Sequence, residues 1–171
     1  MNPEDPVTHA CEGAERMSQA GAPRHEILTR LVTAAEVVAG SGAVSSILIL
    51  NREGLLRNGA SPNLPRDYLD AIDRLKPDAK VGTCAAAAAT GSIVVTQDFR
   101  ADDKWAELRH LPLALGFAGA WSMPIKSSVD GRVLGTFGTY FRNSREPTTE
   151  EMSAVRRLAT VAAGVLERTP A

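Results

Sequence analysis

The chain has 171 residues, of which 44% are hydrophobic, 23% charged and 5% aromatic, a balance typical of one ordinary globular domain. Its net charge of −1 provides no electrostatic footprint for nucleic acid or for an anionic membrane surface. Two cysteines are too few for a disulfide framework, and no apolar run approaches the roughly 20 residues of a membrane-spanning helix. These features favour a cytoplasmic protein with neither nucleic acid nor membrane as its partner.

The first 21 residues contain two prolines, two glycines and few apolar side chains. We therefore expect a mobile leader or frayed helix over 1–21 and one folded domain over 22–171. Pro23 suits the first turn of a helix, and the apolar residues that follow recur at helical spacing. They predict an amphipathic helix over about 23–39, which Gly40 ends.

A hairpin is predicted next, because residues 44–50 end in a β-branched apolar run and an Asn-Arg-Glu-Gly turn separates them from 55–61. A short helix follows over about 65–75, with its apolar residues on one face. The alanine-rich segment 83–90 is expected to be helical, with Thr83 as its N-cap.

The second half of the chain predicts a short strand at 93–95 and a helix over 101–115 that Pro112 bends or restarts. Strands at 120–125 and 133–141 are joined through an Asp-Gly pair, which is a strong signal for a hairpin turn.

The chain closes with a predicted amphipathic helix over about 148–168, which the capping box Thr148-x-x-Glu151 begins. This order of elements predicts an α+β fold with a central antiparallel sheet of about five strands.

Two motifs, WSMPI at 121–125 and VLGTF at 133–137, resemble the second half of a GAF domain of the bacterial sensor kinase and cyclic-di-GMP signalling type. The resemblance covers residues 23–168. It implies a PAS-like GAF fold, with the N- and C-terminal helices on one face of the sheet and a ligand pocket on the other. Two positions depart from the family pattern, since Ala85 replaces a glycine and Asp103 replaces the proline of a D-P-x-W motif.

Strand alternation divides the two central strands between the faces of the sheet. The face that we expect to line the pocket is small and hydroxyl-bearing, and it holds Ala120, Ser122, Pro124, Thr136, Gly138 and Tyr140. The face that we expect under the terminal helices is larger and apolar, and it holds Trp121, Met123, Ile125, Val133, Phe137 and Phe141. In tetrapyrrole-binding relatives, the positions that resemble Ser122 and Tyr140 face the ligand.

Helix 83–90 is expected to point its free amides toward the hydroxyl-bearing face, where they would receive the polar or anionic end of a ligand. The opposing interpretation is a filled core whose hydroxyls bond to nearby backbone. The candidate ligand-binding residues are Cys84, Ala85, Ala86, Trp105, His110, Ser122, Thr136 and Tyr140.

The predicted function is that of a small-molecule or small-anion sensor in signal transduction of the two-component kind, without catalytic residues. GAF domains bind chemically diverse ligands, so the cofactor or ligand stays open. The chain is expected to form a homodimer through helices 23–39 and 148–168 and to act on a downstream kinase or cyclase module. Small residues on the last helix would allow close approach, namely Ala159, Ala162, Ala163 and Gly164.

Two alternatives are a ligand-free dimerisation module and a small enzyme that resembles free methionine sulfoxide reductase. The reductases carry a cysteine at the position of Cys84, but they have further cysteines downstream that this chain lacks. Its three histidines fall in no metal-ligand spacing, so no metal site is predicted.

Overall fold

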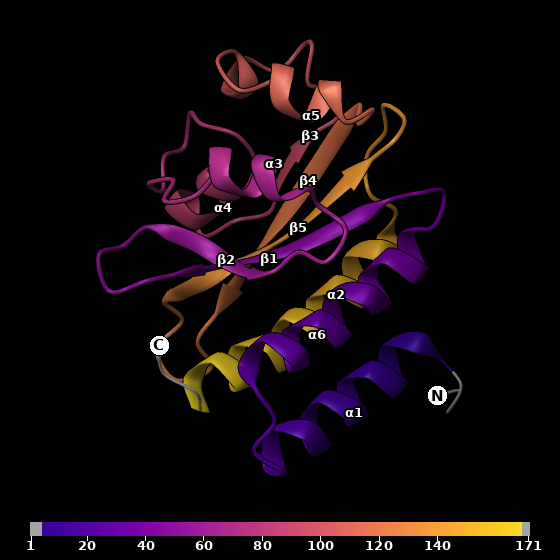
Figure 1. The fold of residues 1–171 in the computed structure, drawn as a ribbon, viewed down its shortest axis with the longest axis vertical. Helices are drawn as coiled ribbons and strands as arrows, with labels where there is room; N and C mark the ends of the chain where they lie inside the picture. The colour runs from indigo at the N-terminus through magenta and orange to yellow at the C-terminus, as the bar shows by residue number, and fades with distance from the viewer. Residues whose placement is uncertain (1–4, 169–171) are drawn as a thin grey trace.

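The computed structural model describes residues 5–168, shown in Figure 1. Its helices are α1 (Pro6–Gln19), α2 (Arg24–Ala39), α3 (Arg66–Ala71), α4 (Cys84–Thr90), the 3₁₀ turn η1 (Asp103–Trp105), α5 (His110–Ala114) and α6 (Thr149–Arg168). Its strands are β1 (Val44–Leu50), β2 (Leu56–Ala60), β3 (Val94–Thr96), β4 (Gly119–Lys126) and β5 (Val133–Phe141).

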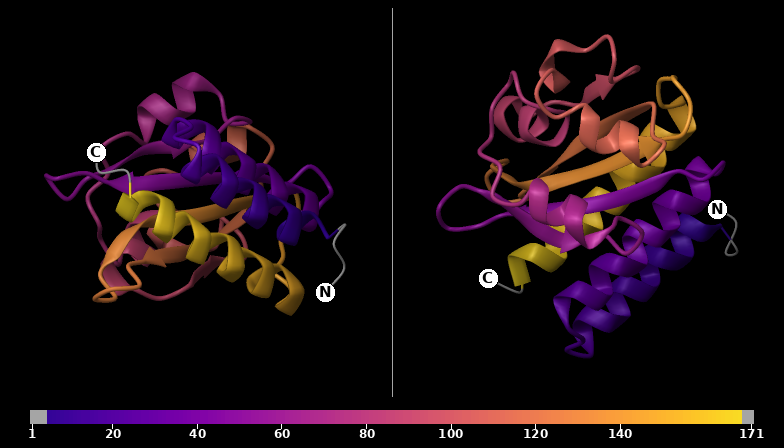
Figure 2. Two further views of the ribbon diagram at one scale, coloured as in Figure 1. Left: turned by 90° about the horizontal axis from the view of Figure 1, so that it is seen from below. Right: turned by 45° about the horizontal axis from the view of Figure 1, so that its top comes forward.

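The strands form one antiparallel sheet in the order β2-β1-β5-β4-β3, so the two hairpins meet where β1 pairs with β5. Helices α2 and α6 cover one face of this sheet, with α1 packed on their outer side, and α3, α4 and α5 lie over the other face (Figures 1 and 2). The α+β architecture predicted from the order of the elements is confirmed.

The expectation of a mobile leader is wrong for the described part of residues 1–21, because α1 is a packed helix. Asp5 caps it by accepting a hydrogen bond from the Val7 N–H at 3.2 Å, and Pro6 occupies the first turn. The Asp-Pro pair therefore starts a helix. Val7, Ala10 and Ala14 form a buried stripe against the terminal helices. Residues 1–4 lie outside the described range.

Gly13 brings α1 close to α2. A Cβ atom built at this glycine would collide with the guanidinium group of Arg30, which packs across it. Arg157 of α6 holds the other end of α1, because its guanidinium donates to the Thr8 hydroxyl at 2.9 Å. Helix α1 is thus fixed to both α2 and α6.

Strand alternation is confirmed at all but one of the large apolar positions. Trp121, Met123, Ile125, Phe137 and Phe141 pack with α1, α2 and α6, as predicted. Val133 was expected on the same side, but it packs with the opposite cluster, and its neighbour Leu134 packs on the helical side instead. The cause is a register shift in the β4–β5 pairing that interrupts the alternation at the start of β5.

The predicted helix over 101–115 forms as two short pieces, η1 and α5. Arg109 stands between them and donates to backbone carbonyls of the preceding loop, including that of Arg100 at 2.8 Å. Thr83 precedes α4 as predicted, but its side chain makes no capping hydrogen bond to the helix. The capping box at α6 is confirmed, since Thr148 and Glu151 exchange two hydrogen bonds of 3.0 Å.

The alanine-rich face of α6 does not point to solvent. Ala159, Ala162 and Ala163 are each at most 5% exposed and belong to the core between the sheet and the helices. These residues allow close packing inside the chain, so they are not accessible for contact with a second copy.

Candidate functional site

The candidate site lies between the sheet and the layer of α3, α4 and α5. The hydroxyl-bearing side chains Ser122 and Thr136 are both 0% exposed there, and Tyr140 is 5% exposed. Ser122 comes from β4 and pairs with Gly138 of β5. Thr136 and Tyr140 lie on β5, two residues before and two residues after Gly138. Strand alternation therefore places these three side chains on the same face, as the sequence predicts.

Tyr140 is joined to a second tyrosine, Tyr68, which is not among the predicted site residues. The hydroxyls of Tyr140 and Tyr68 lie 2.7 Å apart, and their rings meet edge to face with centroids separated by 5.8 Å. Burial raises the pKa of both phenols well above the usual value for tyrosine, although the hydrogen bond from Tyr140 partly lowers that of Tyr68. Both side chains are therefore neutral at physiological pH.

Three further rings complete an aromatic cluster around Tyr140. Phe117 stacks against Tyr140 with centroids 5.2 Å apart, and Phe99 lies 6.4 Å from it. Trp105 meets the other side of Phe99 at 4.6 Å. In the sequence, Tyr68, Phe99 and Phe117 cannot be distinguished from ordinary core residues. Only their packing against Tyr140 in the structure connects them with the site.

Cys84, the first residue of α4, points at the sheet. The Ser122 hydroxyl donates to the Cys84 sulfur at 3.4 Å, and a Cβ atom built at Gly138 would lie 3.0 Å from that sulfur. The absence of a side chain at Gly138 thus makes room for the thiol. Burial raises the pKa of Cys84, and the nearby hydroxyls of Ser122, Thr136 and Thr83 offset this increase only in part. The thiol is protonated and is a weak nucleophile.

Two buried polar atoms on this side of the sheet have no hydrogen-bond partner among the described residues. They are the indole nitrogen of Trp105 and the hydroxyl oxygen of Thr136, which lies near enough to the Cys84 sulfur to influence its pKa but makes no hydrogen bond of good geometry to it. Two other atoms of this kind, in Arg30 and Trp121, belong to the helical side. An unpaired buried donor costs about 1–3 kcal/mol, so each of these two groups would gain free energy from an acceptor.

The loop that carries Trp105 is held to the sheet by a carboxylate. Asp102 accepts hydrogen bonds from the Thr96 hydroxyl at 2.6 Å and from the Lys104 ammonium at 2.9 Å. Partial burial would raise the pKa of Asp102, but these hydrogen bonds outweigh it and lower that pKa below its usual value. The carboxylate is ionised and holds the loop that carries Trp105 in place.

The structure brings together most of the predicted site residues. Cys84, Ser122, Thr136 and Tyr140 lie on the face beneath α4, and Trp105 joins them through Phe99. Ala85 and Ala86 are each 1% exposed in the first turn of α4. His110 is the exception, because it is exposed at the start of α5 and does not belong to the buried cluster.

Within residues 5–168, no group of three or more histidine, cysteine or acidic side chains is arranged to hold a metal ion. The same part of the chain contains no helix that is long and apolar enough to cross a membrane.

A comparison with protein families shows that the model for the GAF domain matches residues 21–167, from just after α1 to the last turn of α6. The chain belongs to the GAF family. The antiparallel sheet with helices on both faces is the GAF fold. The resemblance carried by the two strand motifs is confirmed.

Among curated proteins, the GAF domain is similar to the methyl sulfide methyltransferase-associated sensor of Methanosarcina acetivorans. The two are 34% identical over 152 residues, which are 88% of this chain and 15% of that protein. The chain thus spans only a small part of the length of this relative.

Solved structures share the fold at low sequence identity. The GAF domain of a phosphoenolpyruvate-protein phosphotransferase from Coxiella burnetii superposes with a TM-score of 0.74 and 17% identity, and covers 98% of this chain and 95% of its own. Free methionine-R-sulfoxide reductase from Neisseria meningitidis superposes with a TM-score of 0.68 and 16% identity, with coverage of 95% and 86%. At these identities the similarity concerns the fold alone.

Proposed function

We propose that this GAF domain is a sensory module of a cytoplasmic signalling protein. It binds a small molecule or small anion on the sheet face of Ser122, Thr136 and Tyr140 and passes its occupancy to the terminal helices. The observation that carries the proposal is the enclosed polar cluster, in which the Thr136 hydroxyl and the Trp105 N–H lack partners. Similarity to a curated sensor supports the same class of function.

A ligand in this site would gain hydrogen bonds to unpaired polar groups and would displace aromatic contacts that the unliganded protein makes. Its acceptor atom would pair with the Thr136 hydroxyl or the Trp105 N–H, each of which costs free energy while unpaired. To enter, it would displace part of the aromatic cluster, where the Tyr68–Tyr140 hydrogen bond now joins α3 to the sheet. Ligand binding would therefore move α3 relative to β5.

A route from this site to α6 runs along β5. Phe141 follows Tyr140 and faces the helical side of the sheet. The guanidinium of Arg145 lies 3.7 Å from the Phe141 ring centroid and pairs with Glu151, in the first turn of α6, at 2.6 Å. A shift of β5 would thus reach the start of α6 through these three residues.

The positions of the cysteines favour a sensor over a sulfoxide reductase. Cys84 packs on the α4 side of the sheet, whereas Cys11 of α1 packs on the helical side. The sheet lies between them, so they cannot form the disulfide that a thiol-based catalytic cycle would need without a large rearrangement.

The test is a thermal-shift screen with carboxylates, phosphates, nucleotides and neutral metabolites, applied to the parent protein and matched variants. A ligand at 100 times its dissociation constant adds about 2.7 kcal/mol to the folded state. Thr136→Val removes the unpaired hydroxyl, so it should leave the unliganded protein at least as stable while reducing the shift by about half, because the loss of one hydrogen bond weakens binding by about tenfold. Thr139→Val is the control, because Thr139 lies on the opposite face and bonds to Ser45 at 2.8 Å.

Retention of the full shift in both Thr136→Val and Trp105→Phe would place the ligand elsewhere. If no compound shifts the melting temperature, and native mass spectrometry of the purified protein detects no retained small molecule, the ligand-free dimerisation module becomes the better description.

A further inference from the structure

A separate cleft of about 590 Å³ opens at the end of the sheet where α6 stops. The β1–β2 turn, the β4–β5 loop, the start of α2 and the last turn of α6 meet there (Figures 1 and 2). The volume is within the range of about 300–1,000 Å³ that is typical of small-molecule sites. The cleft shares no lining residue with the site of Ser122, Thr136 and Tyr140.

The lining of this cleft combines positive charge with an apolar floor. Three arginines come from three different elements: Arg24 from the start of α2, Arg52 from the β1–β2 turn and Arg132 from the β4–β5 loop. Aliphatic side chains lie between them, among them Ile49, Leu134 and Leu166.

One carboxylate, that of Glu167, also lines the cleft. It already accepts hydrogen bonds from the Ser128 N–H at 3.1 Å and from the Ser128 hydroxyl at 3.4 Å. Arg132 pairs with Asp130 at 3.2 Å, but both side chains are exposed and such pairs contribute little free energy in water. Among the charged side chains that line the cleft, three arginines thus stand against one carboxylate.

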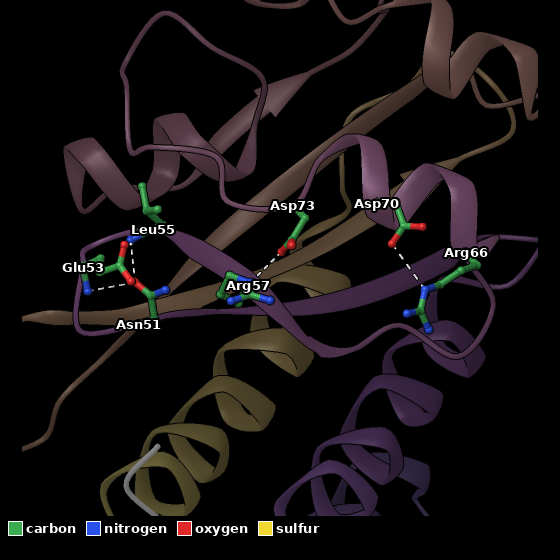
Figure 3. Close-up of polar contacts among 7 residues, drawn as sticks. All are labelled: Asn51, Glu53, Leu55, Arg57, Arg66, Asp70 and Asp73. Atoms are coloured by element: carbon green, nitrogen blue, oxygen red, sulfur yellow. Dashed lines mark hydrogen bonds and ion pairs between the residues drawn. The ribbon is translucent and has the colours of Figure 1, made fainter.

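The turn that presents Arg52 is held in one conformation. The side-chain oxygen of Asn51 accepts hydrogen bonds of 3.0 Å from the backbone N–H groups of Glu53 and Leu55 (Figure 3). Gly54 completes the turn with a φ of 78°, a conformation that favours glycine. Arg52 thus projects from a fixed backbone, and among the described residues it has no ion-pair partner.

The loop that carries Arg132 is held in the same way. Ser127, which is 5% exposed, accepts a hydrogen bond from the Val129 N–H at 3.1 Å through its hydroxyl, and its own N–H donates to the Arg132 carbonyl at 2.8 Å. Asp130 accepts from the Arg132 N–H at 3.0 Å. Both arginine-bearing turns are therefore ordered before any ligand arrives, which lowers the entropic cost of binding.

We propose that this cleft binds an organic anion: a molecule with an apolar or aromatic body and at least one carboxylate, sulfonate or phosphate group. The planar guanidinium groups suit such oxyanions, which they bind through paired hydrogen bonds, and the aliphatic floor suits the body. The ligand would bridge the start of α2 and the end of α6. The site is independent of the proposed sensory site, and either can exist without the other.

The test uses a pair of probes that differ only in charge, anilinonaphthalene sulfonate and the uncharged N-phenylnaphthylamine. Calorimetric titration of the full chain should give one saturable site for the sulfonate, with at least about tenfold weaker binding of the neutral probe. The double variant Arg52→Gln/Arg132→Gln should weaken sulfonate binding by about tenfold or more, because it removes two charged donors.

The matched control is Arg16→Gln/Arg66→Gln, which changes the net charge equally at two exposed arginines outside the cleft; Arg66 pairs only with Asp70 in Figure 3. It should bind the sulfonate as the parent does. Absence of saturable binding, equal affinity for the two probes, or equal loss in the cleft and control variants would each overturn the proposal.

Discussion

The hydrogen bond between Tyr68 and Tyr140 shows how single side chains set the properties of the candidate site. It joins α3 to β5 within a layer that excludes water, since both residues are at most 5% exposed. In such surroundings a hydroxyl without a partner costs more than the pair itself contributes. Each tyrosine hydroxyl therefore relies on the other as its hydrogen-bond partner, and the effects of removing them on the free energy of unfolding are coupled.

We predict that Tyr140→Phe lowers the free energy of unfolding by about 1–3 kcal/mol, because it leaves the Tyr68 hydroxyl buried and unpaired. The double variant Tyr68→Phe/Tyr140→Phe should cost less than the sum of the two single changes. Urea denaturation of all four proteins measures this coupling. Strictly additive costs would mean that each hydroxyl has another partner in solution.

At the scale of elements, the start of α6 is fixed by a group of charged and polar side chains. Glu151 is buried, pairs with Arg145 and accepts the Thr148 N–H at 3.0 Å. Burial raises the pKa of Glu151, but the hydrogen bonds from Arg145 and Thr148 outweigh it and lower that pKa below its usual value. The ionised carboxylate therefore stabilises the folded state.

We predict that Glu151→Gln lowers the free energy of unfolding by about 1–3 kcal/mol at neutral pH. Because the folded-state pKa is the lower one, this contribution is complete above the unfolded value of about 4.3 and disappears as the pH falls through the folded value. Denaturation curves at several pH values should thus show parent and variant converging in acid. Glu150→Gln, at the exposed neighbour, is the control and should change stability by no more than about 0.5 kcal/mol.

At the scale of the whole molecule, α1 changes where a second copy could bind. The alanine face of α6 is buried inside the chain, so the proposed dimer needs another surface. A mostly apolar groove between α1 and α2 offers one, and its lining includes Ala10, Met17 and Val37. Val37 is 60% exposed, which is unusual for a large apolar side chain on a helix of this protein.

We predict that the parent protein is a dimer and that Val37→Glu converts it to a monomer, because a charge in the groove would be buried by the partner. Light scattering after gel filtration measures the mass of both. Val129→Glu is the matched control, since Val129 is 82% exposed but lies in the β4–β5 loop, near the start of α2 and at the opposite end of that helix from Val37. A monomeric parent protein at high concentration, or a Val37→Glu variant that remains dimeric, would contradict this interface.

The sequence by itself determined most of the elements and the faces of most residues in the central strands, because hydrophobic periodicity and capping signals act over a few residues. The capping box at Thr148 and the alternation that aligns Ser122 with Thr136 and Tyr140 belong to this class. It did not determine the helical character of α1, because the buried stripe of that helix is short and is stabilised by α2 and α6.

Only the tertiary structure decided which distant residues meet. Tyr68 and Tyr140 are 72 positions apart, and Cys84 and Ser122 are 38 apart, so no local pattern could pair them. The arginines of the cleft likewise come from one helix and two turns that the fold brings to one end of the sheet. Local patterns fix what each segment becomes, whereas packing of those segments decides which side chains form a site.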